Sequence, residues 1–155
     1  FIMSFTQEKL GKESSTLLLP QDMLRREILY TRDGFNTRTI PFLINLLTYG
    51  KQNCEYVILE GILTASWYHP VFIEAVKLFS NEIYAYYYDL SFEETLKRHS
   101  ERSKSLEFGE MEMRKWWNEK DYLPNIKESI LTEDDSLESV FHSICSDLGL
   151  LCKIK

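Results

Sequence analysis

Apolar and polar residues along this chain follow two alternating periods, one typical of strands and one of helices. The apolar runs at 17–19 and 56–59 are short and continuous, as in strands buried on both faces of a parallel sheet. Between them, in 37–49, apolar residues recur every three or four positions, which indicates an amphipathic helix. The same patterns predict strands over 15–19, 55–59, 83–88 and 130–132. They predict helices over 4–10, 22–30, 37–49, 68–79, 92–101, 110–120 and 136–148.

Helix-capping residues support several of these boundaries. Ser91 and Glu94 have the spacing of a capping box, Ser136 is placed to cap the last helix, and Gly149 suits its end. Because strands alternate with helices, we expect right-handed βαβ units and a parallel sheet covered by helices on both faces. The chain contains no repeat, linker or low-complexity tract, so we expect 1–155 to form a single domain.

Composition narrows the class of protein. The chain has 155 residues, of which 44% are hydrophobic and 27% charged, as in an ordinary globular domain. Its net charge of −6 argues against nucleic acid as a partner, although a local basic pocket is still allowed. No apolar stretch is long enough to span a membrane, and no signal-peptide pattern is present. The three cysteines form neither a metal spacing nor an even disulfide set, so we expect a reducing cytoplasm.

The run from Tyr56 to Gly61 is the first candidate for chemistry, because an apolar strand there ends on Glu60. Open α/β sheets place their ligands at the carboxyl ends of their strands. Phosphoryl-transfer enzymes use such an acid to hold Mg²⁺, directly or through water. The alternative is a buried strand with a solvated glutamate at its tip.

A second candidate follows the strand over 15–19, where Asp22 lies in the first turn of a helix and Arg25 follows three residues later. A carboxylate there can accept a proton from a substrate hydroxyl, and an arginine one turn on can bind a phosphate or carboxylate of the same substrate. We assign Arg26, the next residue, to the same substrate. The alternative is an acid that favours the helix N-terminus and forms an (i, i+3) ion pair.

The third candidate is a pair of arginines, Arg98 and Arg102, which lie four positions apart on one face of the helix over 92–101. Two guanidinium groups at this spacing can bind a triphosphate or neutralise charge during its transfer. The alternative is a solvated basic face paired with Glu94 and Glu101.

Together these residues lie in stretches that resemble the P-loop kinase group. This group includes chloramphenicol phosphotransferase, zeta-toxin kinases, polynucleotide 5′-hydroxyl kinases and uridine-kinase-like proteins, and small bacterial proteins of the last kind look most similar. The resemblance covers 4–148 and is carried by LLLPQDMLRREIL, CEYVILEGIL, YYYDLSFEETLKRHSER and FGEMEMRKWW. It implies a P-loop NTPase-like three-layer α/β/α sandwich with a five-stranded parallel sheet in the order 2-3-1-4-5. It also implies ATP- and Mg²⁺-dependent transfer of the γ-phosphoryl group to a hydroxyl of a small molecule or nucleoside.

The resemblance also implies roles for individual residues. Asp22 would be the general base, and Arg25 would bind the acceptor. Glu60 would hold Mg²⁺ through water. Arg98 and Arg102 would belong to a lid, about 98–115, that closes over the phosphates of ATP.

Two further residues are candidates for ligand contacts. Trp116 follows Arg114 and Lys115 on the helix after the lid, where its ring would line the acceptor pocket, although ordinary packing or exposure is the alternative. Asp134 follows the last strand, where related kinases contact the adenine, but its charge also suits the N-terminus of the final helix.

The chain departs from this family at the Walker A motif, G-x-x-x-x-G-K-[ST], which is absent. That motif lies between the first strand and first helix of such kinases and supplies the phosphate cradle, the lysine and a Mg²⁺ ligand. We interpret 1–3 as the end of that strand and 4–11 as part of that helix, with roughly ten residues missing between Met3 and Ser4. The alternative is a true truncation, which would leave a degenerate, non-catalytic nucleotide-binding or interaction protein.

The sequence leaves the acceptor and the oligomeric state open. A nucleoside, an antibiotic, a sugar nucleotide and a polynucleotide 5′-hydroxyl all suit a D-x-x-R pocket.

Overall fold

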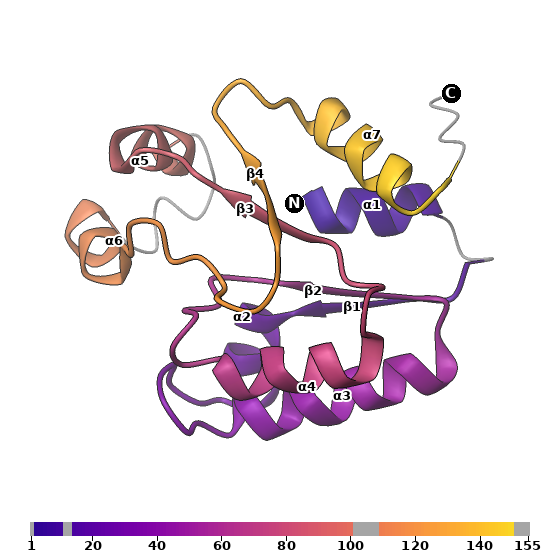
Figure 1. Cartoon of the computed structure of the whole chain (residues 1–155). Helices are drawn as coiled ribbons and strands as arrows, with labels where there is room; N and C mark the ends of the chain where they lie inside the picture. The colour runs from indigo at the N-terminus through magenta and orange to yellow at the C-terminus, as the bar shows by residue number, and fades with distance from the viewer. Residues whose placement is uncertain (1, 11–13, 101–108, 151–155) are drawn as a thin grey trace. The chain divides into compact units, whose positions relative to one another are not determined.

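The computed structural model describes residues 2–10, 14–100 and 109–150, with only the backbone described for 2–5. The chain is mixed α/β and divides into two compact units (Figure 1). The first unit contains the residues up to Ile83 together with Leu123–Ile126, and the second contains Tyr84–Tyr122 and the residues from Lys127 onward.

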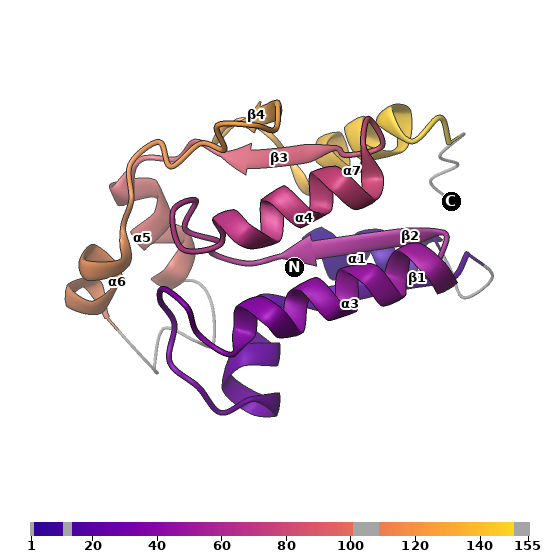
Figure 2. The same ribbon diagram turned by 60° about the horizontal axis from the view of Figure 1, so that its bottom comes forward.

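The first unit is built on a pair of parallel strands, β1 (Thr16–Pro20) and β2 (Tyr56–Glu60). Helix α1 (Ile2–Leu10) packs on β1, and α3 (Thr39–Asn53) packs on both strands. Helix α4 (His69–Phe79) lies beside α3 (Figures 1 and 2). The strands and helices of this unit therefore form where the apolar pattern of the sequence predicts them.

The core of the first unit fills the space between the strands and these helices. Leu43 and Leu47 point from α3 into this core, where they are 0% and 3% exposed, because residues four apart share one helix face. Leu19 of β1 and Val71 of α4 complete the contact and are almost fully buried. Burial of one such side chain stabilises the fold by about 1.5–3 kcal/mol.

The segment after β1 is an irregular helix. It begins as α2 (Gln21–Met23) and continues as a π-helix, η1 (Leu24–Ile28). The π character is visible in the bond from the Leu29 amide to the Leu24 carbonyl, which spans five residues at 3.0 Å. The predicted helix over 22–30 is confirmed in position, but its hydrogen bonding differs from that of a regular α-helix.

The second unit also contains one pair of parallel strands. Tyr86 of its first strand donates a hydrogen bond of 2.5 Å to Asp147 of its last helix. Ser136 caps that helix by accepting from the Ser139 amide at 3.1 Å, as the sequence predicts, and Gly149 follows with φ +65°. The elements are β3 (Ala85–Tyr88), α5 (Phe92–Ser100), α6 (Glu110–Trp116), β4 (Glu128–Leu131) and α7 (Leu137–Asp147).

The expected three-layer sandwich with a five-stranded parallel sheet is wrong, because the described strands form two separate two-stranded sheets. The outer pairs of the expected order 2-3-1-4-5 do form, as β1–β2 and β3–β4. The strand expected between them does not form, since Ile2 and Met3 belong to α1 and Phe1 lies outside the described residues. Three residues offer too few ladder bonds to compete with a nine-residue helix.

Helix α1 also bears on the segment expected between Met3 and Ser4. The helix runs through both residues without interruption, so the backbone has no break there. The interpretation of 1–3 as the end of a strand is therefore wrong.

Two further observations concern membrane-spanning helices and the cysteines. No helix in the described ranges has the length and apolar character needed to cross a membrane. Cys54 is a free thiol, whereas Cys145 takes part in a disulfide bond that the sequence analysis did not expect. The expectation of a reducing cytoplasm stays a prediction.

Candidate functional site

The carboxyl ends of β1 and β2 lie side by side, because Pro20 is paired with Glu60 in the parallel register. The D-x-x-R segment begins just after Pro20, so Asp22 lies just beyond the sheet edge at which Glu60 also lies. The prediction that Glu60 ends a strand is confirmed. The sheet edge thus gathers two acidic candidates from segments that are far apart in the sequence.

Arg25 lies in the π-helix and contacts residues that precede and follow this helix in the sequence. Its Nη2 donates to Oδ1 of Asp22, and its Nη1 donates to the Thr31 carbonyl at 3.4 Å. Its Nε lies 3.8 Å from Oδ2 of Asp33. The Arg25 side chain is 18% exposed and that of Asp22 is 44% exposed. The Asp22 carboxylate is therefore more accessible to a ligand than the Arg25 guanidinium that contacts it.

Asp33 is the acceptor at the centre of a polar network that the sequence analysis missed. It accepts from the Tyr68 hydroxyl at 2.5 Å, from the Gly34 amide at 3.0 Å and from Nε2 of Gln21 at 3.4 Å. Gln21 also donates to the Tyr68 hydroxyl at 2.5 Å. In the sequence, the pair Asp33–Gly34 signals only a turn, and no spacing rule connects it with Tyr68.

Tyr68 is 0% exposed and remains a neutral hydrogen-bond donor over a wide pH range. Burial raises the pKa of its hydroxyl above the ordinary value of 10.0, and the hydrogen bond to Asp33 raises it further. Tyr68 therefore donates its hydrogen bond at neutral pH and anchors Asp33 beside Arg25.

Arg26 also contacts Asp22, with its Nη1 3.4 Å from Oδ2. Both side chains are nearly half exposed, at 47% and 44%. The ion pairs that we gave as the alternative reading of D-x-x-R are therefore present. The catalytic role of Asp22 and the acceptor-binding roles of Arg25 and Arg26 stay predictions.

Arg98 lies in the second unit and is held by two acceptors. Its Nε donates to Glu94 at 2.7 Å, and its Nη2 donates to the Glu133 carbonyl at 3.1 Å. The hydrogen bond from Arg98 lowers the pKa of the Glu94 carboxyl. Arg102 and residues 101–108 of the expected lid lie outside the described residues. The pairing with Glu94 given as the alternative reading is therefore observed for Arg98.

The other candidates of the second unit lie on its surface. Trp116 is 51% exposed, whereas its neighbour Trp117 packs edge-on against Phe92 with ring centroids 5.4 Å apart. Asp134 is exposed in the turn before α7, and the carboxylate that closes this turn is that of Asp135, which accepts from the Thr132 amide at 2.7 Å. The candidate residues thus fall into two groups, one in each unit.

Magnesium is implied by the resemblance, so the fit of Glu60 to this ion can be assessed. Among the described residues there is no group of three or more His, Cys, Asp or Glu side chains placed to hold a metal. Mg²⁺ usually keeps several waters and takes one or two carboxylates together with substrate phosphates. Glu60 therefore suits an ion held through water beside nucleotide phosphates and does not suit a cage made of protein ligands alone.

Comparisons of the chain with protein-family models, curated proteins and solved structures find no match. The resemblance to P-loop kinases therefore rests on the four quoted stretches of sequence.

Proposed function

We propose that the chain is an ATP- and Mg²⁺-dependent phosphotransferase that acts on a hydroxyl of a small molecule or nucleoside. The observation that supports this proposal is the arrangement around Asp22. This carboxylate is 44% exposed, contacts the partly buried Arg25, and lies just beyond the same sheet edge as Glu60.

In this proposal Asp22 accepts the proton of the attacking hydroxyl. Arg25 holds one carboxylate oxygen, and Asp33 with Tyr68 holds Arg25. Such a supporting layer keeps a reacting group within a narrow range of positions. Arg26, which is nearly half exposed, would bind an anionic group of the acceptor.

The remaining groups would act on the nucleotide. Mg²⁺ would supply charge neutralisation at the phosphates of ATP, and Glu60 would hold it through water. Arg98 and Arg102 would contact phosphates of the nucleotide, and Arg98 would have to exchange its bond to Glu94 or Glu133 for a phosphate oxygen. Trp116 would stack on the acceptor, and Asp134 would contact the adenine.

A second candidate function is a non-catalytic nucleotide-binding or interaction protein. Helix α1 favours it, because it runs unbroken through Met3 and Ser4, where the resemblance expects the phosphate loop of an active kinase.

The two functions are distinguished by ADP release in the presence of ATP, Mg²⁺ and a panel of acceptors. The panel contains nucleosides, amino-sugar antibiotics, sugar nucleotides and an oligonucleotide with a free 5′-hydroxyl. We expect acceptor-dependent turnover that falls about 10²- to 10⁴-fold in Asp22→Asn. Glu27→Gln, which removes an exposed acid from the same helical segment, should leave turnover unchanged.

Other outcomes decide against the enzyme. Nucleotide binding without turnover for any acceptor would support the second function. Turnover that is equal in Asp22→Asn and the unsubstituted chain would remove Asp22 from the mechanism.

A further inference from the structure

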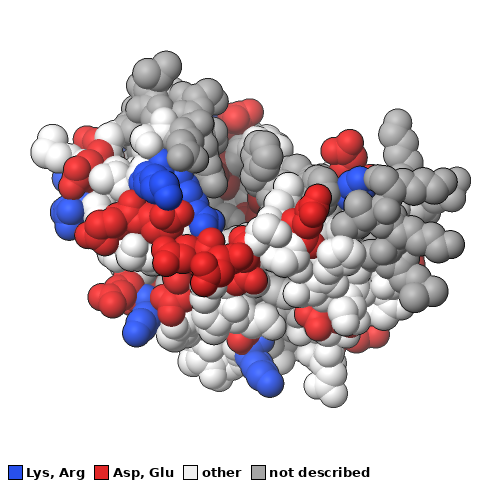
Figure 3. Space-filling model, turned by 90° about the horizontal axis from the view of Figure 1, so that it is seen from above, with Lys and Arg blue, Asp and Glu red and all other residues white. Residues whose placement is uncertain are grey.

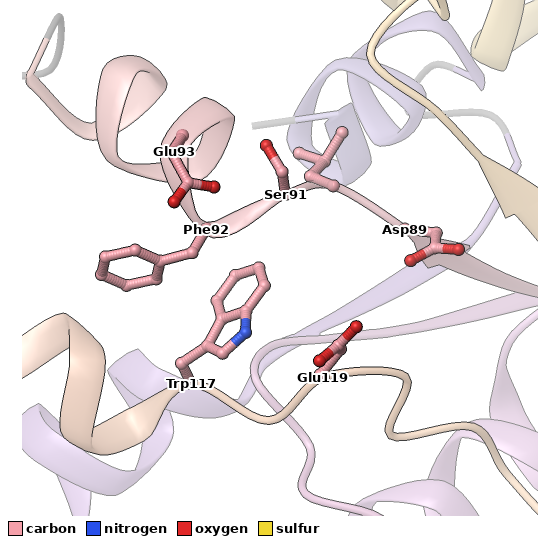
Figure 4. Close-up of a pocket in the computed structure, with 7 residues that line it drawn as sticks. Asp89, Ser91, Phe92, Glu93, Trp117 and Glu119 are labelled. Carbon is pink, nitrogen blue, oxygen red and sulfur yellow. The ribbon is translucent and has the colours of Figure 1, made fainter.

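A pocket with a volume of about 350 Å³ lies in the second unit, between the end of β3 and the segment that follows α6 (Figure 4). Its aromatic wall is formed by Phe92, which is 9% exposed, and by Trp117, which is half-buried. The two rings meet edge to face at 80°, so a face of an indole or phenyl ring can turn toward a ligand. A pocket of this size matches the lower end of the range for small-molecule sites.

Three carboxylates surround this wall, namely Asp89, Glu93 and Glu119. Figure 4 shows the Glu119 carboxylate beside the Trp117 ring, on the side that faces Asp89, with Glu93 on the side of Phe92. Asp89 accepts a hydrogen bond of 3.1 Å from Tyr122, which is a neutral donor. Within the described part of the chain, none of the three carboxylates has an ion pair. The pocket therefore combines aromatic faces with negative charge that no described basic side chain pairs.

Arg114 shows that this aromatic wall accommodates a cation. Its Cζ lies 4.3 Å from the centroid of the Phe92 ring, and its Nη2 forms a 3.0 Å ion pair with Glu110. Arg114 does not line the pocket. The pocket side of the wall therefore remains available to a second positive group.

We infer that this pocket binds an organic cation with a primary ammonium group. Carboxylate oxygens of Asp89 and Glu119 would accept its N–H bonds, and the Trp117 ring would attract its charge. The aliphatic part of the ligand would lie against Leu90 and Phe92. Such a cation is chemically different from ATP. Its binding to this pocket does not require the chain to be a phosphotransferase.

Two other ligand classes fit the pocket less well. An anion would be attracted by the N-terminus of α5, but three carboxylates would repel it. A bare metal ion needs several oxygen or nitrogen ligands converging on one point, and no such group occurs among the described residues.

The test is isothermal titration calorimetry of the full chain with 1,5-diaminopentane, with 1,5-pentanediol as the neutral analogue. We expect the diamine to bind and the diol not to bind, and we expect the affinity to fall as salt is raised from about 20 to about 200 mM. Inorganic phosphate should neither bind nor compete.

Two variants locate the site, and each has a matched control. Trp117→Leu and Glu119→Gln should each weaken diamine binding about fivefold to tenfold. Tyr84→Leu and Glu138→Gln, which change an exposed aromatic residue and an exposed acid outside the pocket, should bind as tightly as the unsubstituted chain. Thermal melting of each variant confirms that it is folded.

Several outcomes would overturn the inference. These are equal binding of diol and diamine, competition by phosphate, equal losses in the pocket variants and their controls, or the absence of diamine binding to the folded chain.

The net charge gives a weak background attraction for any cation, and one face of the molecule carries more acidic than basic side chains (Figure 3). The controls remove this background, because Glu138→Gln and Glu119→Gln each remove one negative charge from the chain.

Discussion

The hydroxyl of Tyr68 donates a 2.5 Å hydrogen bond to Oδ1 of Asp33, which lies 35 positions earlier in the chain. This bond joins the residue before α4 to the loop after the π-helix. Because Asp33 also lies 3.8 Å from Arg25, the bond supports the arginine that orients Asp22. A buried tyrosine thus fixes a surface carboxylate through two intervening side chains.

Tyr68→Phe should lower the free energy of unfolding by about 1–3 kcal/mol, because Asp33 loses a donor and Gln21 loses an acceptor in a buried site. Urea unfolding followed by circular dichroism measures this change. The control is Tyr30→Phe in the same unit, where the tyrosine is 93% exposed and its replacement should cost almost nothing. Equal stabilities of the two variants would show that the network contributes nothing to folding.

The same tyrosine predicts a loss of stability in alkali. Its pKa is raised above 10.0 in the folded chain, first by burial and then by Asp33, so above pH 10 the folded state binds more protons than the unfolded state. Its contribution to stability is therefore complete below the unfolded pKa and is lost as the pH rises through the folded pKa. Between about pH 9 and pH 11, Tyr68→Phe should lose less unfolding free energy than the unsubstituted chain. Tyr86 has a pKa raised by burial and by Asp147, so part of the slope should remain.

Gly61→Ala should be more destabilising than Gly34→Ala. Both glycines have positive φ, at +147° and +137°, which an alanine adopts only with strain of about 1–3 kcal/mol. A Cβ at position 61 would also lie 2.9 Å from Cβ of Gln21, whereas a Cβ at position 34 meets nothing within 4 Å. Thermal melting of the two variants isolates this contact, since backbone strain is common to both. A larger loss in Gly34→Ala would contradict the prediction.

Arg98→Gln should raise the pKa of the Glu94 carboxyl toward its ordinary value of 4.5. The hydrogen bond from Arg98 is the largest cause of the lowered pKa, ahead of the charge of Lys97. NMR titration of the Glu94 carboxyl carbon measures the change. Lys97→Gln is the matched control and should give a smaller rise. If Arg98 were mobile and did not bond to Glu94, Arg98→Gln would leave the pKa of Glu94 unchanged.

The helices and strands could be predicted because their signals are local. The run ending at Glu60 and the Ser136 cap each lie within a few residues of the boundary that they set. The way in which the strands pair into sheets could not be predicted from such local signals. The expected single sheet depended on Ile2 and Met3 forming a strand, and the structure places them in a helix.

The candidate site was predicted only in part, for a similar reason. Asp22 and Arg25 are neighbours on one helical segment, so their contact follows from spacing alone. The contacts of Asp33 with Gln21 and Tyr68 join three segments of the first unit. No periodicity relates residues at such separations, and the identity of the supporting groups therefore required the folded arrangement.

The π-helix over Leu24–Ile28 makes this segment tolerant of a loss of one codon. Its wide turn holds one residue more than a regular α-helical turn, so deletion of Glu27 would restore regular α-helical bonding. The extra residue is taken up within that turn, and the chain on either side would therefore keep its direction. Asp22 and Arg25 would keep their contact, and Asp33 would stay beside Arg25. The π-helix is thus a place where inheritance can shorten the chain by one residue without dismantling the site.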